Sequence, residues 1–144
     1  MAGLLINIDV PELEQGIAFY TAAFELRLSR RLGSGFAELL GGGSPIYLLQ
    51  TDAGSRPFRD APVRRDFARH WTPIHLDFVV DDLDAALARA LAAGAIQESE
   101  PSEHAYGHLV LLSDPFGHGV CLLQFNAQGY DALAGPSRPG EGPA

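Results

Sequence analysis

The sequence has no lysine and a single cysteine. All ten basic residues of the 144-residue chain are arginine, and the formal net charge at pH 7 is −8. An acidic surface argues against nucleic acid or an anionic membrane as a partner, because both attract basic proteins. Cys121 alone cannot form an internal disulfide, and a lone thiol fits a reducing compartment, so we expect a cytoplasmic protein.

Long apolar runs are also missing. No stretch reaches the roughly 18 consecutive apolar residues that a membrane-spanning helix needs. Hydrophobic residues nevertheless make up 47% of the chain and charged residues 19%. This balance is typical of a globular domain with a core and not of a disordered chain.

What the sequence does contain is an internal repeat. The stretch "LINIDVPELEQGIAFYTAAFEL", from Leu5, aligns with "HLDFVVDDLDAALARALAAGAI", from His75, at an offset of 70 residues. Further on, "PIYLLQ" (45–50) matches "GVCLLQ" (119–124) at an offset of 74. A four-residue insertion in the second copy explains the drift, so we infer two modules of the same design.

Each module opens with apolar residues at every second position, which predicts a strand with one face in a core. A helical pattern follows in both copies. Pro11 suits the first helical turn, Asp82 suits an N-cap, and Gly94 suits the residue after the helix end. Shorter strands separated by turn residues are then expected at 26–32, 35–40 and 45–50, and at 96–100, 107–113 and 119–125.

These patterns predict an α+β fold made of two tandem βαβββ modules, whose mixed sheet curls into a cup with the helices on its outer face. We expect one domain over residues 1–128. It is divided into a first module (4–50), a linker (51–72) and a second module (73–125), and followed by a flexible tail (129–144) rich in Gly and Pro. The linker contains five arginines between Arg56 and Arg69. They form either a solvated face or a carboxylate- or phosphate-binding patch.

The strand alternation separates the two faces of the sheet. The helices must cover the face that carries Ile6, Ile8, Leu76 and Phe78. The opposite face mixes polar and apolar side chains, which is typical of a ligand cavity with apolar walls. The candidate ligand-binding residues on this face are Asn7, Asp9, Tyr47, His75, Asp77 and Cys121.

Tandem βαβββ modules resemble the vicinal oxygen chelate superfamily, which includes glyoxalase I, extradiol dioxygenases, and bleomycin- and fosfomycin-resistance proteins. The resemblance covers residues 4–125 and rests on the two module openings and on "SDPFGHGVCLLQF" (113–125). It implies a cup formed by the two sheets, and a homodimer. In metal-dependent members the ligands occupy one position in the first strand and one in the last strand of each module. Here those four positions hold Leu5, Tyr47, His75 and Cys121.

Of these four, only His75 is a usual ligand at a family position, so we expect no complete metal site, although a divalent ion on His75, Asp77 and Cys121 stays open. The first functional hypothesis is a protein of the bleomycin-resistance type that sequesters a small organic molecule. The alternative is a glyoxalase-like lyase or isomerase in which His75 acts as acid/base or metal ligand and Asp77 orients it. A third reading is a regulatory subunit whose cup holds no ligand.

For three further residues the sequence predicts only a location. His118 lies in the turn before the last strand, where a solvated position is expected. Trp71 and Arg69, just before the second module, suit either the rim of a site or a dimer contact.

Overall fold

The computed structural model describes residues 1–135, and the first module has the expected element order. Its elements are β1 (Ile6–Val10), α1 (Leu13–Phe24), β2 (Arg27–Arg31), β3 (Phe36–Leu40) and β4 (Ile46–Gln50). Helix α1 begins at Leu13 with Glu12 as N-cap, so Pro11 precedes the helix instead of lying in its first turn.

The second module repeats this order with one addition. Its elements are β5 (Leu76–Val79), α2 (Leu83–Ala93), β6 (Ile96–Gln97), β7 (Ser102–His104), β8 (Gly107–Ser113) and β9 (Gly119–Phe125). The strand expected at 96–100 is shorter than predicted, and the short strand β7 was not foreseen. Pro101 has no N–H to donate, so the edge is split into two pieces, β6 and β7, which both pair with β8.

Each module forms its own mixed sheet. The strand orders are β1-β4-β3-β2 and β5-β9-β8-β6, with β7 also on β8. The first and last strands of each module run parallel and share one register, so Asn7 faces Tyr47 and Asp77 faces Cys121. The predicted α+β fold of two βαβββ modules is therefore confirmed.

One contact positions the helix in both modules. Gln50, at the end of β4, accepts a hydrogen bond from the backbone N–H of Leu13 at 2.9 Å. Gln124, near the end of β9, accepts one from the N–H of Leu83 at 2.7 Å. Each glutamine thus satisfies one of the free N–H groups at a helix N-terminus and ties that helix to its sheet.

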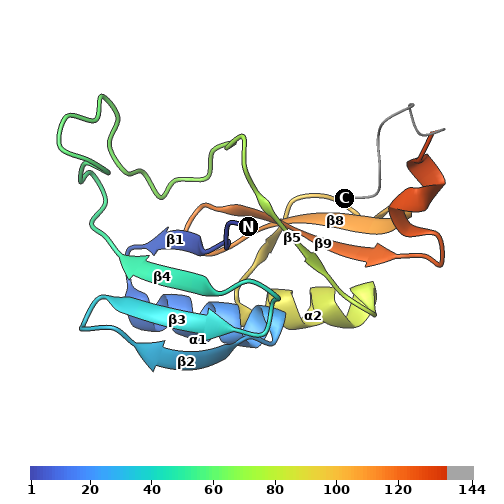
Figure 1. Ribbon diagram of the computed structural model, residues 1–144, viewed down its shortest axis with the longest axis horizontal. Coiled ribbons are helices and arrows are strands. Elements are labelled where there is room, and N and C mark those ends of the chain that lie inside the picture. Colours follow the sequence, from blue (N-terminus) through green and yellow to red (C-terminus); the bar gives the residue numbers. More distant parts are fainter. Residues whose placement is uncertain (136–144) are drawn as a thin grey trace.

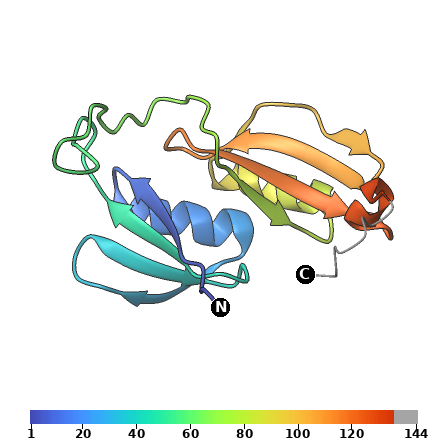
Figure 2. The ribbon, with the colours of Figure 1, turned by 45° about the horizontal axis from the view of Figure 1, so that its top comes forward.

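Both helices lie on the same side of the two sheets, while residues 51–72 run along the opposite side (Figure 1). Figure 2 shows the two modules next to each other, with a helix behind each sheet. The buried apolar side chains between helices and sheets form one cluster that includes residues of both modules. As expected, Ile8 is buried in this cluster, and Ile6, Leu76 and Phe78 pack against it.

The modules are joined by contacts of three kinds. Phe24 stacks on Phe78 with ring centroids 3.9 Å apart. The Tyr20 hydroxyl donates a 2.6 Å hydrogen bond to the buried carboxylate of Asp114. In addition, Phe19 meets Phe116 edge-on at 6.4 Å. Because apolar packing is reinforced here by a buried hydrogen bond, the two modules are held in one arrangement.

The segment after β9 is more ordered than its composition suggests. Gly129–Leu133 form a 3-10 helix, and Tyr130 packs edge-on against Phe125 with ring centroids 4.8 Å apart. The tail expected at 129–144 thus begins with a helical turn that packs against Phe125. Residues 136–144 lie outside the described part of the chain. Within residues 1–135, neither helix has the length and apolar character needed to cross a membrane.

Candidate functional site

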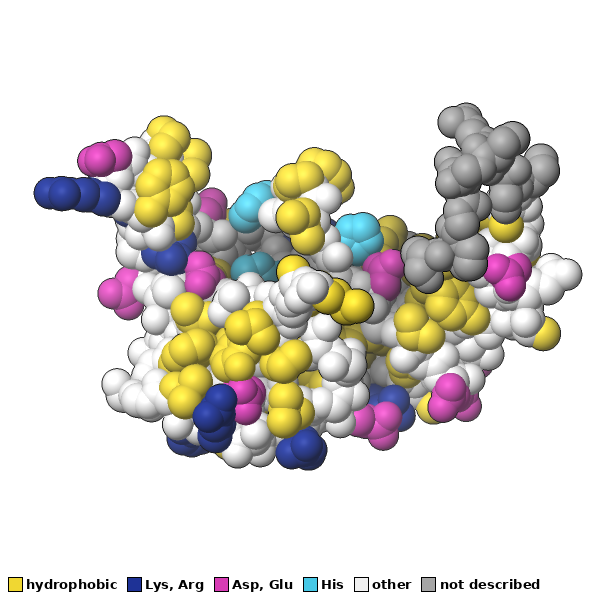
Figure 3. Space-filling model, viewed as in Figure 1, with side chains coloured by type: hydrophobic (Ala, Val, Ile, Leu, Met, Phe, Trp, Pro, Cys, Tyr) yellow, Lys and Arg dark blue, Asp and Glu magenta, His cyan; other side chains and the backbone are white. Residues whose placement is uncertain are grey.

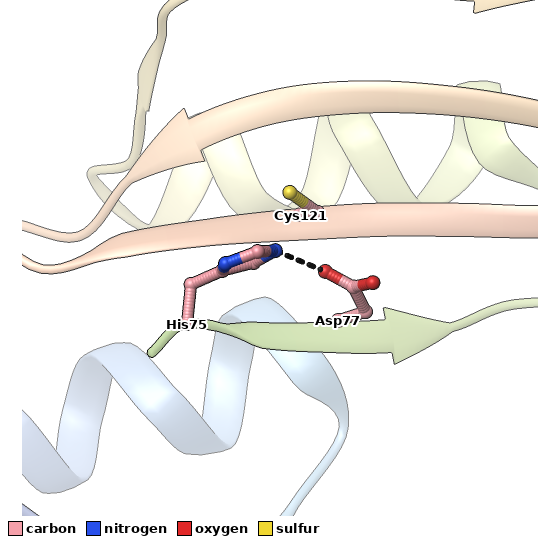
Figure 4. A group of neighbouring side chains, drawn as sticks. All are labelled: His75, Asp77 and Cys121. Atoms are coloured by element: carbon pink, nitrogen blue, oxygen red, sulfur yellow. Dashed lines mark ion pairs between the residues drawn. The ribbon is translucent and has the colours of Figure 1, made fainter. Parts of the chain in front are cut away.

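Three side chains from the second module meet on the sheet face opposite the helices. His75 directly precedes β5, Asp77 lies within it, and Cys121 is the β9 neighbour of Asp77. The Nε2 atom of His75 is 3.1 Å from Oδ1 of Asp77 (Figure 4). One potential metal-ligand atom from each of the three residues lies within 4.8 Å of the others. The parallel pairing of β5 and β9 thus gathers groups that are distant in sequence.

Cys121 is buried, and its thiol is held in the protonated form. Burial is the largest cause that raises the pKa of Cys121, and the charge and hydrogen bond of Asp77 add to it, so that the pKa reaches about 12. The thiolate, and not the thiol, is the nucleophile and the metal ligand. At pH 7 this cysteine is therefore a wall of the site and a hydrogen-bonding partner of Asp77, and it is unsuited to nucleophilic catalysis.

Two cavities meet at His75. One, of about 290 Å³, is lined by residues that include Arg69, Trp71, Glu98 and Cys121. The other, of about 490 Å³, is lined by residues that include Asn7, Asp9, Ile74 and His118. His75, together with Thr72, Gly119 and Val120, borders both cavities. Figure 3 shows histidine side chains around a hollow near the middle of this face, with apolar side chains next to it.

The 51–72 linker forms one wall of this site and is attached to both modules. Arg65 Nε lies 2.7 Å from Oδ2 of Asp9 in the first module. Arg69 Nε lies 2.6 Å from Oε1 of Glu98 in the second. Gly119 leaves room for Arg69, since a Cβ at this position would stand 2.7 Å from its Nη2. The basic patch of the linker is thus used at least partly to pair with carboxylates of the cup.

The residues of the first module that correspond to His75 and Cys121 make different contacts. Tyr47 donates a 2.6 Å hydrogen bond to Glu38, which Arg30 also contacts through Nε at 3.1 Å and Nη2 at 3.2 Å. The hydrogen bond from Tyr47 is the largest cause that lowers the pKa of Glu38 to about 2, followed by that from Arg30. The same contact with Glu38 raises the pKa of Tyr47. Leu5, at the position of His75, is 58% exposed.

The predicted residues are therefore only partly brought together. His75, Asp77 and Cys121 form one group, and Asn7 and Asp9 reach the cavity that His75 shares. Tyr47 lines neither of these two cavities, because Glu38 holds its hydroxyl.

Four residues of the site were missed or assigned only loosely by sequence reasoning. Glu98 and Leu111 were missed altogether. Arg69 was assigned to a rim or a dimer contact, and the structure places it in a cavity wall. His118 was expected to be solvated, but it is half-buried, with Nε2 2.7 Å from the carbonyl oxygen of Asp9. The arginine cluster in the linker was the one signal that pointed to the contact between Arg69 and Glu98.

Of the four positions at which the family resemblance predicts metal ligands, only His75 holds a usual ligand. Leu5 has no donor atom, the phenol of Tyr47 is bonded to Glu38, and the thiol of Cys121 is protonated. The group of His75, Asp77 and Cys121 still offers three potential donors. His75 and Cys121 occupy two of the four positions, and Asp77 lies outside them. An ion bound there would first have to displace the thiol proton.

The two-module fold agrees with comparison to known proteins. The model of the family described as "Glyoxalase-like domain" matches residues 5–123. The chain belongs to this glyoxalase-like family. Among curated proteins, the anthracycline biosynthesis protein DnrV of Streptomyces peucetius is 36% identical over 66 residues, which cover 46% of this chain and 22% of DnrV. The match thus spans only about a fifth of the length of DnrV.

Solved structures share the glyoxalase-like fold at low sequence identity. TioX from Micromonospora sp. ML1 superposes with a TM-score of 0.65 at 18% identity, over 88% of this chain and 100% of TioX. The fosfomycin resistance protein FosX from Listeria monocytogenes gives a TM-score of 0.67 at 20% identity, over 89% and 97% of the two chains. A variant of that FosX has been crystallised with Mn(II) and a dihydroxypropylphosphonic acid. At these identities the likeness establishes the fold and leaves the chemistry to the residues of the site.

Proposed function

We propose that this glyoxalase-like protein binds a small organic molecule in the cup around His75 and sequesters it without changing it chemically. The observation that carries this proposal is a pair of cavities meeting at His75, in a site where the family's metal positions hold Leu5, a hydrogen-bonded Tyr47 and a protonated Cys121. A binder needs a cavity with apolar walls and a few polar anchors, whereas the metal-dependent reactions of the family need the ion.

The polar anchors are available and their orientation is set. His75 and Asp77 are held by each other, and their side chains remain 52% and 35% exposed toward the cup. Asn7 reaches the same space from the first module. A ligand bound there would contact residues of both modules. Its binding would therefore also stabilise the contact between the modules.

The test uses protein purified without chelators and an anthracycline, chosen because DnrV is an anthracycline biosynthesis protein. We expect a rise in melting temperature with the ligand, an unchanged ligand mass after recovery from denatured protein, and no stoichiometric metal by elemental analysis. His75→Ala is expected to reduce the melting shift, and the exposed His108→Ala serves as the matched control. A stoichiometric metal that is lost in His75→Ala, or a ligand recovered with altered mass, would contradict sequestration.

The contact between His75 and Asp77 favours a second candidate, an isomerase or lyase in which His75 moves a proton. A carboxylate 3.1 Å from Nε2 sets the orientation and the tautomer of the imidazole, so that Nδ1 could act as the base. This reading predicts deuterium uptake from D2O into the hemithioacetal of methylglyoxal and glutathione, followed by NMR, and its loss in His75→Ala. Absence of uptake at high protein concentration would argue against this activity.

We also propose that the protein forms a homodimer. Several large apolar side chains remain exposed on the second module, among them Val79 at 61% and Ile96 at 61%. Burial of such residues commonly drives association. Light scattering at micromolar concentration should give twice the chain mass, and a monomer under these conditions would contradict the proposal.

A further inference from the structure

The mouth of the cup is bordered by large apolar side chains that are exposed to solvent. Trp71 is 79% exposed and borders the smaller cavity together with Leu111, which is 46% exposed. Ile74 is 81% exposed and borders the larger cavity. A tryptophan held this far into solvent at a cavity mouth offers a flat surface that an aromatic ligand can cover.

Charges inside the cup leave one carboxylate without a permanent cation. Three arginines on this face are each paired with an acidic residue: Arg30 with Glu38, Arg65 with Asp9, and Arg69 with Glu98. The fourth acid is Asp77, and its partner is His75, which unlike arginine is not a permanent cation. Of these four acids, Asp77 is therefore the one without an arginine partner.

A third cavity is lined by more acidic than basic residues. It measures about 540 Å³, lies between the modules, and is bordered by Asp77 together with the acidic residues Glu25, Asp81 and Asp82. Arg89 is the one basic residue in its lining, and Arg89 is already 3.2 Å from Glu25. This cavity shares Ile6 and Leu76 with the larger cavity at His75. Asp77 lines this third cavity and neither cavity at His75, but its carboxylate lies 3.1 Å from the His75 imidazole, which borders the cavity that Trp71 also lines.

We propose that the ligand is a flat aromatic molecule with a protonated amine, which lays its ring against Trp71 and directs its ammonium group toward Asp77. The assignment rests on the proposed binding function and adds the ligand's chemical class. A carboxylate in a cleft attracts a cation more strongly than one in bulk water, because the cleft walls exclude solvent. The net charge of −8 raises the local concentration of cations further.

The experiment uses three probes of simple chemistry and isothermal titration calorimetry. 9-Aminoacridine is a three-ring cation at pH 7, anthracene-9-carboxylate is a three-ring anion, and octylammonium is a cation without a ring. We expect 9-aminoacridine to bind at least 10-fold more tightly than either of the others. Because Trp71 is the only tryptophan of the chain, its fluorescence reports directly on whether a bound ring covers it.

Two variants locate the two ends of the probe. Asp77→Asn is expected to reduce the preference for 9-aminoacridine over anthracene-9-carboxylate to about 2-fold or less. Asp84→Asn removes the same charge from the exposed surface of helix α2 and should leave the preference intact. Trp71→Ala should weaken 9-aminoacridine about 10-fold but octylammonium hardly at all. Melting temperatures of all three variants check that they fold.

The outcomes separate this assignment from the function on which it rests. If the anion or octylammonium binds as tightly as 9-aminoacridine, or if Asp77→Asn keeps the preference, the ligand class is overturned while sequestration stands. If none of the three probes binds, the ligand class is overturned as well, and the anthracycline experiment above decides independently whether the cup binds any ligand.

Discussion

The two modules share the same hydrogen-bonded frame of helix and strands and differ in the side-chain contacts on the cup face. Both use a glutamine at the end of the last strand to hold the helix N-terminus, and both pair the first and last strands in the same register. On the cup face, however, Tyr47 is tied to Glu38 and Arg30, whereas Cys121 lies beside Asp77. Both modules therefore keep the hydrogen-bonded frame, while only the second module carries the candidate site.

The turn before the last strand separates the modules further. In the second module, Asp114 and Phe116 reach across to Tyr20 and Phe19 on helix α1. In the first module the corresponding turn is made of Gly41, Gly42 and Gly43, which have no side chains to offer. The 540 Å³ cavity lies beside this glycine turn, and Arg89 stands there at the position that Phe19 holds in the first repeat. The asymmetry of the two turns thus leaves an open cleft at one end of the module interface.

The largest expected effect on stability comes from a substitution at Asp114, in the packed part of the interface between the modules. Asp114 is 1% exposed and accepts hydrogen bonds from Tyr20 and from the N–H groups of Phe116 and His118. Asp114→Ala leaves these buried donors without a partner, so the free energy of unfolding should fall by about 3 kcal/mol in urea denaturation. Gly42→Ala, in the opposite turn, should change it by less than about 0.5 kcal/mol. Similar losses in the two variants would contradict the asymmetry.

The shared frame predicts an intermediate and nearly equal effect in both modules. Gln50→Ala and Gln124→Ala each remove the acceptor for a helix N-terminal N–H, and each should cost about 1 kcal/mol of unfolding free energy. The half-buried Gln124 should show the greater loss, since water replaces its hydrogen bond less easily. Gln124→Glu keeps an acceptor and serves as control. A loss confined to one module would show that the two caps are not equivalent.

Acid should weaken the first module through Glu38. The pKa of Glu38 in the folded protein is about 2, below its ordinary value of 4.5, so its stabilising contribution is complete above pH 4.5. That contribution is lost as the pH falls from 4.5 toward 2. Urea midpoints at pH 7, 5, 4 and 3 should therefore decline more steeply for the wild type than for Glu38→Gln. Parallel curves would contradict the assigned role of the carboxylate.

The smallest effect on stability at neutral pH is expected at Cys121, where the readout is reactivity. Its pKa is raised to about 12 and it is 3% exposed, so Ellman's reagent at pH 8 should leave the folded protein unmodified and react at once after unfolding. Because the pKa is raised in the folded state, alkali should weaken the fold as the pH rises from about 9 toward 12. Asp77→Asn should speed the modification of the folded protein, because it removes a negative charge near Cys121. An unchanged rate would argue against the contact between Asp77 and Cys121.

Much of the frame could be predicted from residue patterns. Alternation in "INIDV" and "HLDFVV" indicated the first strands, and the repeat offset aligned Asn7 with Asp77 as the structure does. The extra strand β7 was missed, because three residues after a proline carry too little periodicity. The 3-10 helix at Gly129–Leu133 was missed because aromatic contacts with Phe125 stabilise it and not its own composition.

The candidate site divides in the same way. The sequence by itself determined that His75 and Asp77 share a strand face and that Leu5 replaces a donor in the first module, since both follow from a period of two and a repeat. Only the tertiary structure decided that Tyr47 is engaged by Glu38 and that Arg69 closes a cavity wall against Glu98, and it brought the expected Cys121 to within 4.8 Å of His75 and Asp77. These contacts join residues between 9 and 46 positions apart, and local pattern does not encode distances across such separations.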